Sequence, residues 1–171
     1  LGCDEFQGYL CSPAIPAEQF AEKIKDNRKL VDVGDDSGKE RVLLLIDHDP
    51  HVLQSLHRLF SNEGYRILKT DNPEEAYKLL AEHEVGVILC DQSMPVISGT
   101  EFLSNVKAMY PSTVRMILSG YAEMNSIIEA VNQGYIYKFL MKPWDDGLLR
   151  KHIDEAFQFH EMKRARRPDR I

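Results

Sequence analysis

The sequence predicts a doubly wound α/β fold, in which helices cover both faces of a five-stranded parallel sheet. Five short apolar runs, the pattern of strands buried on both faces, alternate with segments whose apolar residues recur at helical spacing. Short connections join these segments, and strand–helix–strand units of this kind form parallel sheets with right-handed crossovers. The 171 residues leave room for one such domain and a shorter appendage.

The first half of the domain is expected to hold three strands and two helices. The run VLLLID begins at Val42, and the helical segment behind it has Pro50 at a favoured first-turn position and Gly64 as its stop. Asn72 and Pro73 open a second helix. We expect strands at 42–47, 65–70 and 85–91, and helices at 50–62 and 72–82.

The second half of the domain continues the alternation. The run TVRMILS predicts a fourth strand, and Gly134 follows the helix behind it. Apolar residues on or beside one stripe, ending near His160, predict a long final helix. We expect helices at 98–110, 123–133 and 144–164, and strands at 113–119 and 137–141.

The composition excludes several classes of function. The net charge of −6 disfavours nucleic-acid binding. Only the basic segment 161–171 could contact phosphate groups, and it is expected to be a helix end or tail. No apolar run approaches the roughly 20 residues of a membrane helix and no signal segment opens the chain, so we expect a cytoplasmic protein without membrane insertion. The three cysteines lack CxxC spacing and are expected to be free thiols, and the histidines other than His48 are expected on the surface.

Polar residues end four of the five predicted strands. Asp47 follows the first strand, Asp91 ends the third, Ser119 ends the fourth and Lys142 follows the fifth. Ligand sites of doubly wound sheets lie outside the carboxyl ends of the strands, so we expect these side chains to converge. Paired carboxylates favour a hard cation such as Mg²⁺, a carboxylate can attack phosphorus, and an amine and a hydroxyl can hold phosphoryl oxygens. Because GxxxxGK[ST] and GxGxxG motifs are missing, the prediction is a phosphoryl site rather than a nucleotide pocket.

Residues 41–160 resemble the receiver domain of two-component response regulators. The motifs that carry the resemblance are LLLIDHDP, LCDQSMPVISGTEFL, MILSGYAE and YKFLMKPWD, in the order and spacing of that family. It implies a flavodoxin-like (βα)5 fold with strand order 2-1-3-4-5 and a regulatory rather than an enzymatic role. A histidine kinase or a phosphotransfer protein would phosphorylate Asp91. Lys142 would contact the phosphoryl group, with Ser119 as the switch hydroxyl and Phe139 as the switch aromatic residue.

The resemblance also implies a cofactor and a dimer. Asp47, Asp91 and the backbone carbonyl of Ser93 would hold Mg²⁺, and a cis peptide bond would join Lys142 to Pro143. Homodimers would form through the fourth helix, the fifth strand and the fifth helix.

One residue departs from the family pattern. The second of two adjacent acids is replaced by His48, and imidazole is a soft ligand for Mg²⁺. Asp49 is acidic but lies one residue further on. Weak Mg²⁺ affinity, slow phosphorylation and loss of phosphorylation are all open at this point. The alternative to a working receiver is a pseudo-receiver, used for dimerisation or docking without phosphorylation.

Residues 1–28 form a separate segment, too short to bury a core of its own. Its run GCDEFQGYLCSPAIPAEQF resembles the last strand and helix of the EAL domain, which hydrolyses cyclic di-GMP. The resemblance implies that Gln7 lies near the active site of a parent phosphodiesterase, which would be the attached output. The other acids of a two-metal site are missing, so this chain is expected to have no hydrolase activity. The polar stretch 29–40 predicts a linker.

Overall fold

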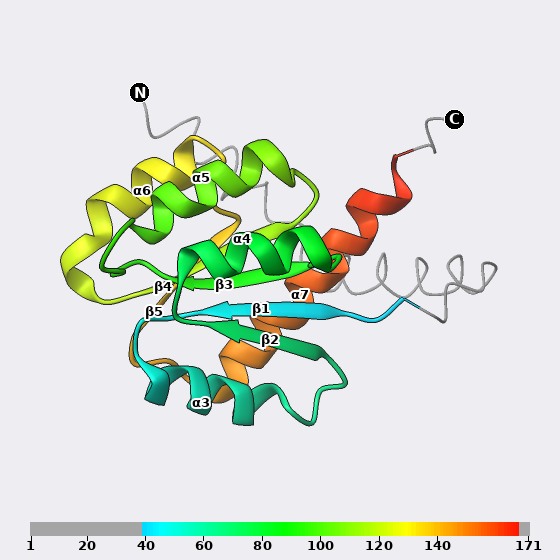
Figure 1. Ribbon diagram of the computed structural model, residues 1–171, viewed down its shortest axis with the longest axis horizontal. Coiled ribbons are helices and arrows are strands. Elements are labelled where there is room, and N and C mark those ends of the chain that lie inside the picture. Colours follow the sequence, from blue (N-terminus) through cyan, green and yellow to red (C-terminus); the bar gives the residue numbers. More distant parts are fainter. Residues whose placement is uncertain (1–38, 168–171) are drawn as a thin grey trace, which may run out of the picture. The chain divides into compact units, whose positions relative to one another are not determined.

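The computed structural model describes residues 39–167 of the chain (Figure 1). The predicted strand and helix at 1–28, with Gln7, lie outside the described residues, as does the linker predicted at 29–40 except for its last two positions. The final four residues, 168–171, also lie outside them.

A five-stranded parallel sheet forms the centre of the described chain, in the order β2-β1-β3-β4-β5 (Figure 1). Leu44 of β1 lies opposite Leu68 of β2 on one side and Ile88 of β3 on the other. Every residue of β1, β3 and β4 is buried, which explains why these strands are apolar except at Asp91, Arg115 and Ser119. The predicted fold class and strand order are confirmed. The strands are β1 (Val42–Ile46), β2 (Arg66–Thr70), β3 (Val87–Asp91), β4 (Val114–Ser119) and β5 (Lys138–Met141).

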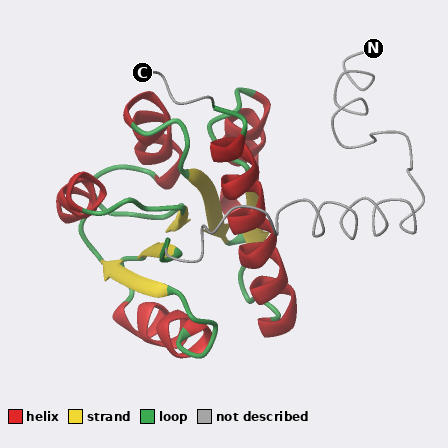
Figure 2. Cartoon of the chain, turned by 90° about the vertical axis from the view of Figure 1, so that its right-hand side faces the viewer, coloured by secondary structure: helices red, strands yellow, loops and turns green. Residues whose placement is uncertain are grey.

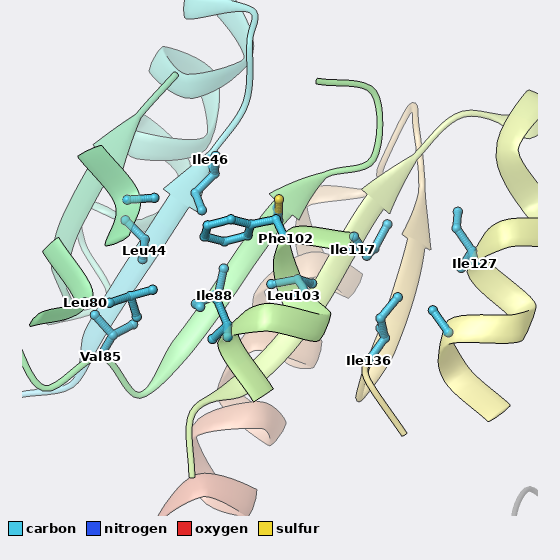
Figure 3. Close-up of a cluster of buried hydrophobic side chains, with 14 of the residues drawn as sticks. Leu44, Ile46, Leu80, Val85, Ile88, Phe102, Leu103, Ile117, Ile127 and Ile136 are labelled. Atoms are coloured by element: carbon cyan, nitrogen blue, oxygen red, sulfur yellow. The ribbon is translucent and has the colours of Figure 1, made fainter. Parts of the chain in front are cut away.

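Helices cover both faces of this sheet (Figure 2). Three of them pack on one face around a cluster that includes Ile88, Phe102 and Ile127 (Figure 3). The other two pack on the opposite face. Neighbouring residues of a strand point to opposite faces, so Leu43 and Leu44 belong to different clusters. The first face carries α4 (Pro73–Glu82), α5 (Gly99–Met109) and α6 (Met124–Asn132), preceded by the 3-10 turn η1 (Tyr121–Glu123), and the second carries α3 (Pro50–Phe60) and α7 (Asp146–Ala165).

Local chemistry sets the ends of these elements. The carboxylate of Asp145 accepts a hydrogen bond from the backbone N–H of Leu148, so α7 begins two residues later than the predicted start at Trp144. Gly64 and Gly134, which follow α3 and α6, have φ values of 78° and 73°. Glycine adopts this left-handed conformation without steric cost. Gly134 directly follows the cap of α6 and ends that helix as predicted, whereas α3 already ends at Phe60 and Gly64 closes the turn that follows it.

Arg41, the residue before β1, ties the start of that strand to α7. Its Nε donates to Oε1 of Glu161 at 2.7 Å and its Nη2 donates to Oε2 at 3.1 Å, while Nη1 lies 3.0 Å from Oδ1 of Asp154. The guanidinium also lies over the ring of Phe157, 5.5 Å from its centroid. Each exposed ion pair contributes little alone, but a two-pronged Arg–carboxylate pair fixes geometry.

The expectation of surface histidines is wrong for His160, whose side chain is buried. His160 continues the apolar stripe of α7 one turn beyond Phe157, and a Cβ on Gly86 would lie 3.3 Å from its Nδ1. Burial, together with the charge of Arg164, lowers the pKa of His160 below its ordinary value. Within residues 39–167, no helix combines the length and the apolar character needed to cross a membrane.

Candidate functional site

The candidate site lies at the carboxyl ends of β1, β3, β4 and β5, which are neighbours in the sheet. Asp47 directly follows β1 and Asp91 is the last residue of β3, and their side chains are only 1% and 3% exposed. Ser119 ends β4, and Lys142 follows β5. The parallel order of the strands therefore brings the four predicted residues to one edge of the sheet.

Lys142 joins the two buried carboxylates. Its Nζ lies 2.9 Å from Oδ2 of Asp47 and 3.1 Å from Oδ1 of Asp91. Burial acts to lower the pKa of Lys142, but the hydrogen bonds and charges of Asp47 and Asp91 outweigh it, so this pKa is raised above its ordinary value. The ammonium thus stays charged at physiological pH and holds the two carboxylates together. The peptide bond between Lys142 and Pro143 is cis, as predicted.

His48 faces the site although its side chain is 47% exposed. Its Nδ1 lies 2.7 Å from Oδ2 of Asp91 and 3.6 Å from Oδ1 of Asp47. Both carboxylate oxygens of Asp91 therefore contact a nitrogen, one from His48 and one from Lys142. The departure from the family pattern places an imidazole directly against the acceptor candidate.

Asp49, the other acid of this loop, is directed to α3. Its Oδ1 accepts a hydrogen bond from the backbone N–H of His51 at 2.8 Å and caps the helix. Its own backbone N–H donates to Oδ1 of Asp47 at 2.9 Å. Asp49 therefore orients the Asp47 carboxylate through its backbone, while its carboxylate serves the helix.

Asp47, His48 and Asp91 could together hold a metal ion. One ligand atom from each of the three residues lies within 4.8 Å of the others. Two nearly fully buried carboxylates are an expensive arrangement unless cations face them, and Lys142 supplies one positive charge against their two negative charges. The donor set and its unbalanced charge fit a divalent cation.

The other predicted site residues lie nearby but are not all turned to the carboxylates. The hydroxyl of Ser119 donates to Oε2 of Glu123 at 3.1 Å and to the backbone carbonyl of Gly120 at 3.0 Å. Phe139 of β5 is half-buried and packs against the core cluster under α4, α5 and α6. Ser93 is exposed in the loop between β3 and α5. Sequence reasoning thus located Ser119 but missed its bond to Glu123, although both residues belong to the motif MILSGYAE.

Sequence reasoning also missed the residues that shape the loop behind Asp91. The backbone N–H of Gly99 donates to the carbonyl of Gln92 at 3.0 Å, and the side-chain Oε1 of Gln92 accepts from the backbone N–H of Thr100 at 2.9 Å. These bonds fold the loop back onto the end of β3. Cys90, beside Asp91, is buried and free, and burial raises the pKa of its thiol well above the ordinary value.

A known protein family matches most of the described chain. Residues 43–154 match the response regulator receiver domain family. This chain belongs to the response regulator receiver domain family. A receiver domain is a regulatory phosphoacceptor domain rather than an enzyme, and its partners are histidine kinases or phosphotransfer proteins.

Relatives with known sequences include two transcriptional regulators. The receiver is 39% identical over 108 residues to the hydrogenase transcriptional regulatory protein HoxA of Cupriavidus necator, covering 63% of this chain and 22% of that protein. It is 28% identical over 122 residues to the transcriptional regulatory protein GlrR of Escherichia coli, covering 71% of this chain and 27% of that protein. The chain spans about a quarter of the length of these curated relatives.

Solved structures match the receiver over most of their length. A protein from Neptuniibacter caesariensis is 32% identical, with a TM-score of 0.72 over 77% of this chain and 96% of that one. The signal receiver domain of an HD domain-containing protein from Pseudomonas fluorescens is also 32% identical, with a TM-score of 0.71 over 75% and 94%.

Proposed function

We propose that this chain is the receiver module of a two-component phosphorelay and that Asp91 accepts the phosphoryl group. The observation that carries the proposal is the Lys142 ammonium, which contacts both buried carboxylates at 2.9 and 3.1 Å. An oxygen of Asp91 would form a bond to phosphorus while the phosphorus–nitrogen bond to the histidine of the donor breaks and that nitrogen keeps the electron pair. Lys142, a compact charge on a flexible stem, can then move from the carboxylate to a phosphoryl oxygen.

A divalent cation completes the proposed site. Asp47, Asp91 and the backbone carbonyl of Ser93 would hold Mg²⁺, which supplies positive charge against the phosphoryl oxygens when it is bound. Asp47 is suited to this role because a hydrogen bond from the Asp49 backbone and an ion pair with Lys142 fix its two oxygens. His48 departs from the oxygen-only ligand set that Mg²⁺ prefers, although its Nδ1 lies 2.7 Å from Oδ2 of Asp91.

Ser119 and Phe139 are proposed to carry the response to phosphorylation. The Ser119 hydroxyl would leave Glu123 and donate to a phosphoryl oxygen, and the half-buried ring of Phe139 would repack. Both residues adjoin the surface formed by α6, β5 and α7. Exposed apolar side chains, Ile128 on α6 and Leu148 on α7, make this surface a candidate for homodimerisation.

The attached output is proposed to be a cyclic di-GMP phosphodiesterase module. Support comes from the run GCDEFQGYLCSPAIPAEQF, with Gln7, in residues 1–28. The names of the curated relatives favour a transcription-regulating output instead. Hydrolysis of cyclic di-GMP by the full-length parent protein, with and without a phosphoryl donor, separates the two: turnover supports the phosphodiesterase output, and its absence refutes it.

A second candidate function is a docking module that works without phosphorylation. The observation in its favour is the 2.7 Å contact between His48 Nδ1 and Asp91 Oδ2, which occupies an oxygen of the acceptor candidate. Such a contact would have to break before a phosphoryl group could approach that oxygen.

Acceptor chemistry tests the two functions directly. The chain is incubated with acetyl phosphate and Mg²⁺ or Mn²⁺, and intact-mass spectrometry measures the phosphoryl adduct. Asp91→Asn is the matched control, since it keeps the size of the side chain and removes the attacking carboxylate. An adduct on the natural chain that is missing from Asp91→Asn supports the phosphorelay. No adduct on either protein with either cation refutes it and favours the docking module.

A further inference from the structure

The spacing of three side chains suggests which kind of cation this receiver takes. His48 Nδ1 lies 2.7 Å from Asp91 Oδ2 and 3.6 Å from Asp47 Oδ1. Two ligands that bind one ion at right angles with bonds of about 2.1 Å lie about 3.0 Å apart. The observed separations bracket this value, so the imidazole already stands where a neighbouring ligand of the two carboxylates would stand.

The loop offers the imidazole, and not a further carboxylate, at this position. Asp49 is the nearest remaining acid in sequence, and its Oδ1 is engaged with the backbone N–H of His51 at the start of α3. Its backbone N–H is also engaged, with Asp47 Oδ1. Turning the Asp49 carboxylate into the pocket would remove the cap of α3 and destabilise that helix. The side-chain donor set is therefore two carboxylate oxygens and one imidazole nitrogen.

This donor set discriminates between cations. Mg²⁺ prefers oxygen ligands and retains its water, so it gains little from an imidazole. First-row transition ions bind imidazole well, and Mn²⁺ and Zn²⁺ also accept carboxylates. We propose that His48 is a metal ligand and that it shifts the preference of the site from Mg²⁺ toward divalent first-row transition ions such as Mn²⁺ and Zn²⁺. This inference rests on the proposed function only in placing the cation in the same pocket.

The charge around the pocket supports the same assignment. Lys142 contacts one oxygen of each carboxylate, and the other two oxygens do not contact it. Of these, Oδ1 of Asp47 accepts the Asp49 backbone N–H and keeps a second lone pair, and Oδ2 of Asp91 contacts only His48 Nδ1 among the described side chains. These are the two oxygens nearest to His48 Nδ1. A cation bound there would be held by all three residues without displacing Lys142.

Binding measurements on the whole 171-residue chain test the inference. Separate titrations with MgCl₂, MnCl₂ and ZnCl₂ are followed by Trp144 fluorescence and calorimetry, and free Mn²⁺ is counted by electron paramagnetic resonance. His48→Ala removes the imidazole from an exposed position with little risk to folding, His48→Asp restores the acid of the family pattern, and His51→Ala is the matched control on the exposed side of α3.

The expected result is a loss of selectivity that is specific to His48. The natural chain should bind Mn²⁺ at least about tenfold more tightly than Mg²⁺. His48→Ala should weaken Mn²⁺ and Zn²⁺ binding by about tenfold while Mg²⁺ changes little, His48→Asp should tighten Mg²⁺, and His51→Ala should behave like the natural chain. Equal Mn²⁺ affinity in the natural chain and His48→Ala would overturn the inference.

Acetyl phosphate separates this failure from failure of the proposed function. An adduct on Asp91 with unchanged cation selectivity in His48→Ala overturns the imidazole ligand and keeps the phosphorelay. Mn²⁺ binding that depends on His48, without any adduct on Asp91, keeps the imidazole ligand and refutes the phosphorelay.

Discussion

Replacing Gly99 by alanine is expected to destabilise the domain and disturb Asp91. A Cβ on Gly99 would overlap the backbone carbonyl oxygen of Asp91, and it would lie 2.9 Å from Cα of Gln92 and 2.9 Å from Cδ1 of Ile117. Two of these three neighbours are backbone atoms that cannot rotate away. Overpacking of this kind costs about 2 kcal/mol, which corresponds to a midpoint shift of about 1 M urea for a slope of about 2 kcal/mol/M.

Urea denaturation followed by Trp144 fluorescence and by circular dichroism measures the change. Gly147→Ala is the matched control, since its Cβ would meet only the side-chain Oδ1 of Asp145 at 3.4 Å and it lies in the exposed first turn of α7. The control should be neutral or slightly stabilising, because alanine favours helix. The acetyl phosphate adduct on Asp91 should also form more slowly in Gly99→Ala. A Gly99→Ala protein as stable as the natural chain would refute the argument that the tight approach of α5 positions Asp91.

Three further predictions concern other contacts. The Glu123 carboxylate competes for the Ser119 hydroxyl, so Glu123→Ala should raise beryllofluoride affinity, measured by fluorescence, about fivefold, the equivalent of a hydrogen bond of about 1 kcal/mol. In a Ser119→Ala background, Glu123→Ala should leave this affinity unchanged, and a change there would contradict the reasoning. Burial depresses the pKa of His160, so the contribution of this residue to stability is full above the ordinary pKa of 6.5 and is lost as the pH falls. The free energy of unfolding, measured with urea, should therefore fall between about pH 7 and pH 5, and it should fall less in His160→Gln. An equal fall in both proteins would contradict this prediction. Arg115 donates to the carbonyls of Tyr135 and Thr113, so Arg115→Met should lower the stability measured by thermal denaturation by about 2 kcal/mol. Arg115→Lys should be destabilised as well, because one amine cannot span both carbonyls. An Arg115→Lys protein as stable as the natural chain would show that the charge alone matters.

The sequence was a good guide to the fold because burial leaves a clear pattern. Strands enclosed on both faces are mostly apolar, so β1, β3 and β4 stand out as apolar runs in the sequence, with Arg115 inside β4 and Asp91 and Ser119 at strand ends. Helix ends were predictable within two residues wherever a cap, a proline or a left-handed glycine sets them. The burial of His160 was not predicted because histidine is less often buried than the apolar residues, although this residue lies on the apolar stripe of α7.

The site was predictable in its members and less so in its contacts. Parallel strand order alone brings Asp47, Asp91 and Lys142 to one edge of the sheet, so their convergence follows from topology. The direction of His48 does not, because a residue just past a strand end can face the pocket or the solvent, and only the turn geometry decides. The capping role of Asp49 was predictable in principle, since an aspartate directly before a proline in the first helical turn is a typical N-cap.

The contact of Arg41 with α7 has a mechanical consequence for the site. Arg41 and Asp47 stand at the two ends of one extended stretch about 20 Å long. Its five strand residues are buried and pair with β2, and four of them also pair with β3. A force on the backbone at Arg41 is shared with Asp154 and Glu161, so part of the load passes into α7 before it reaches β1. The guanidinium therefore anchors the start of β1 to α7, and the Asp47 carboxylate at the other end of the strand keeps its place when a load is applied at Arg41.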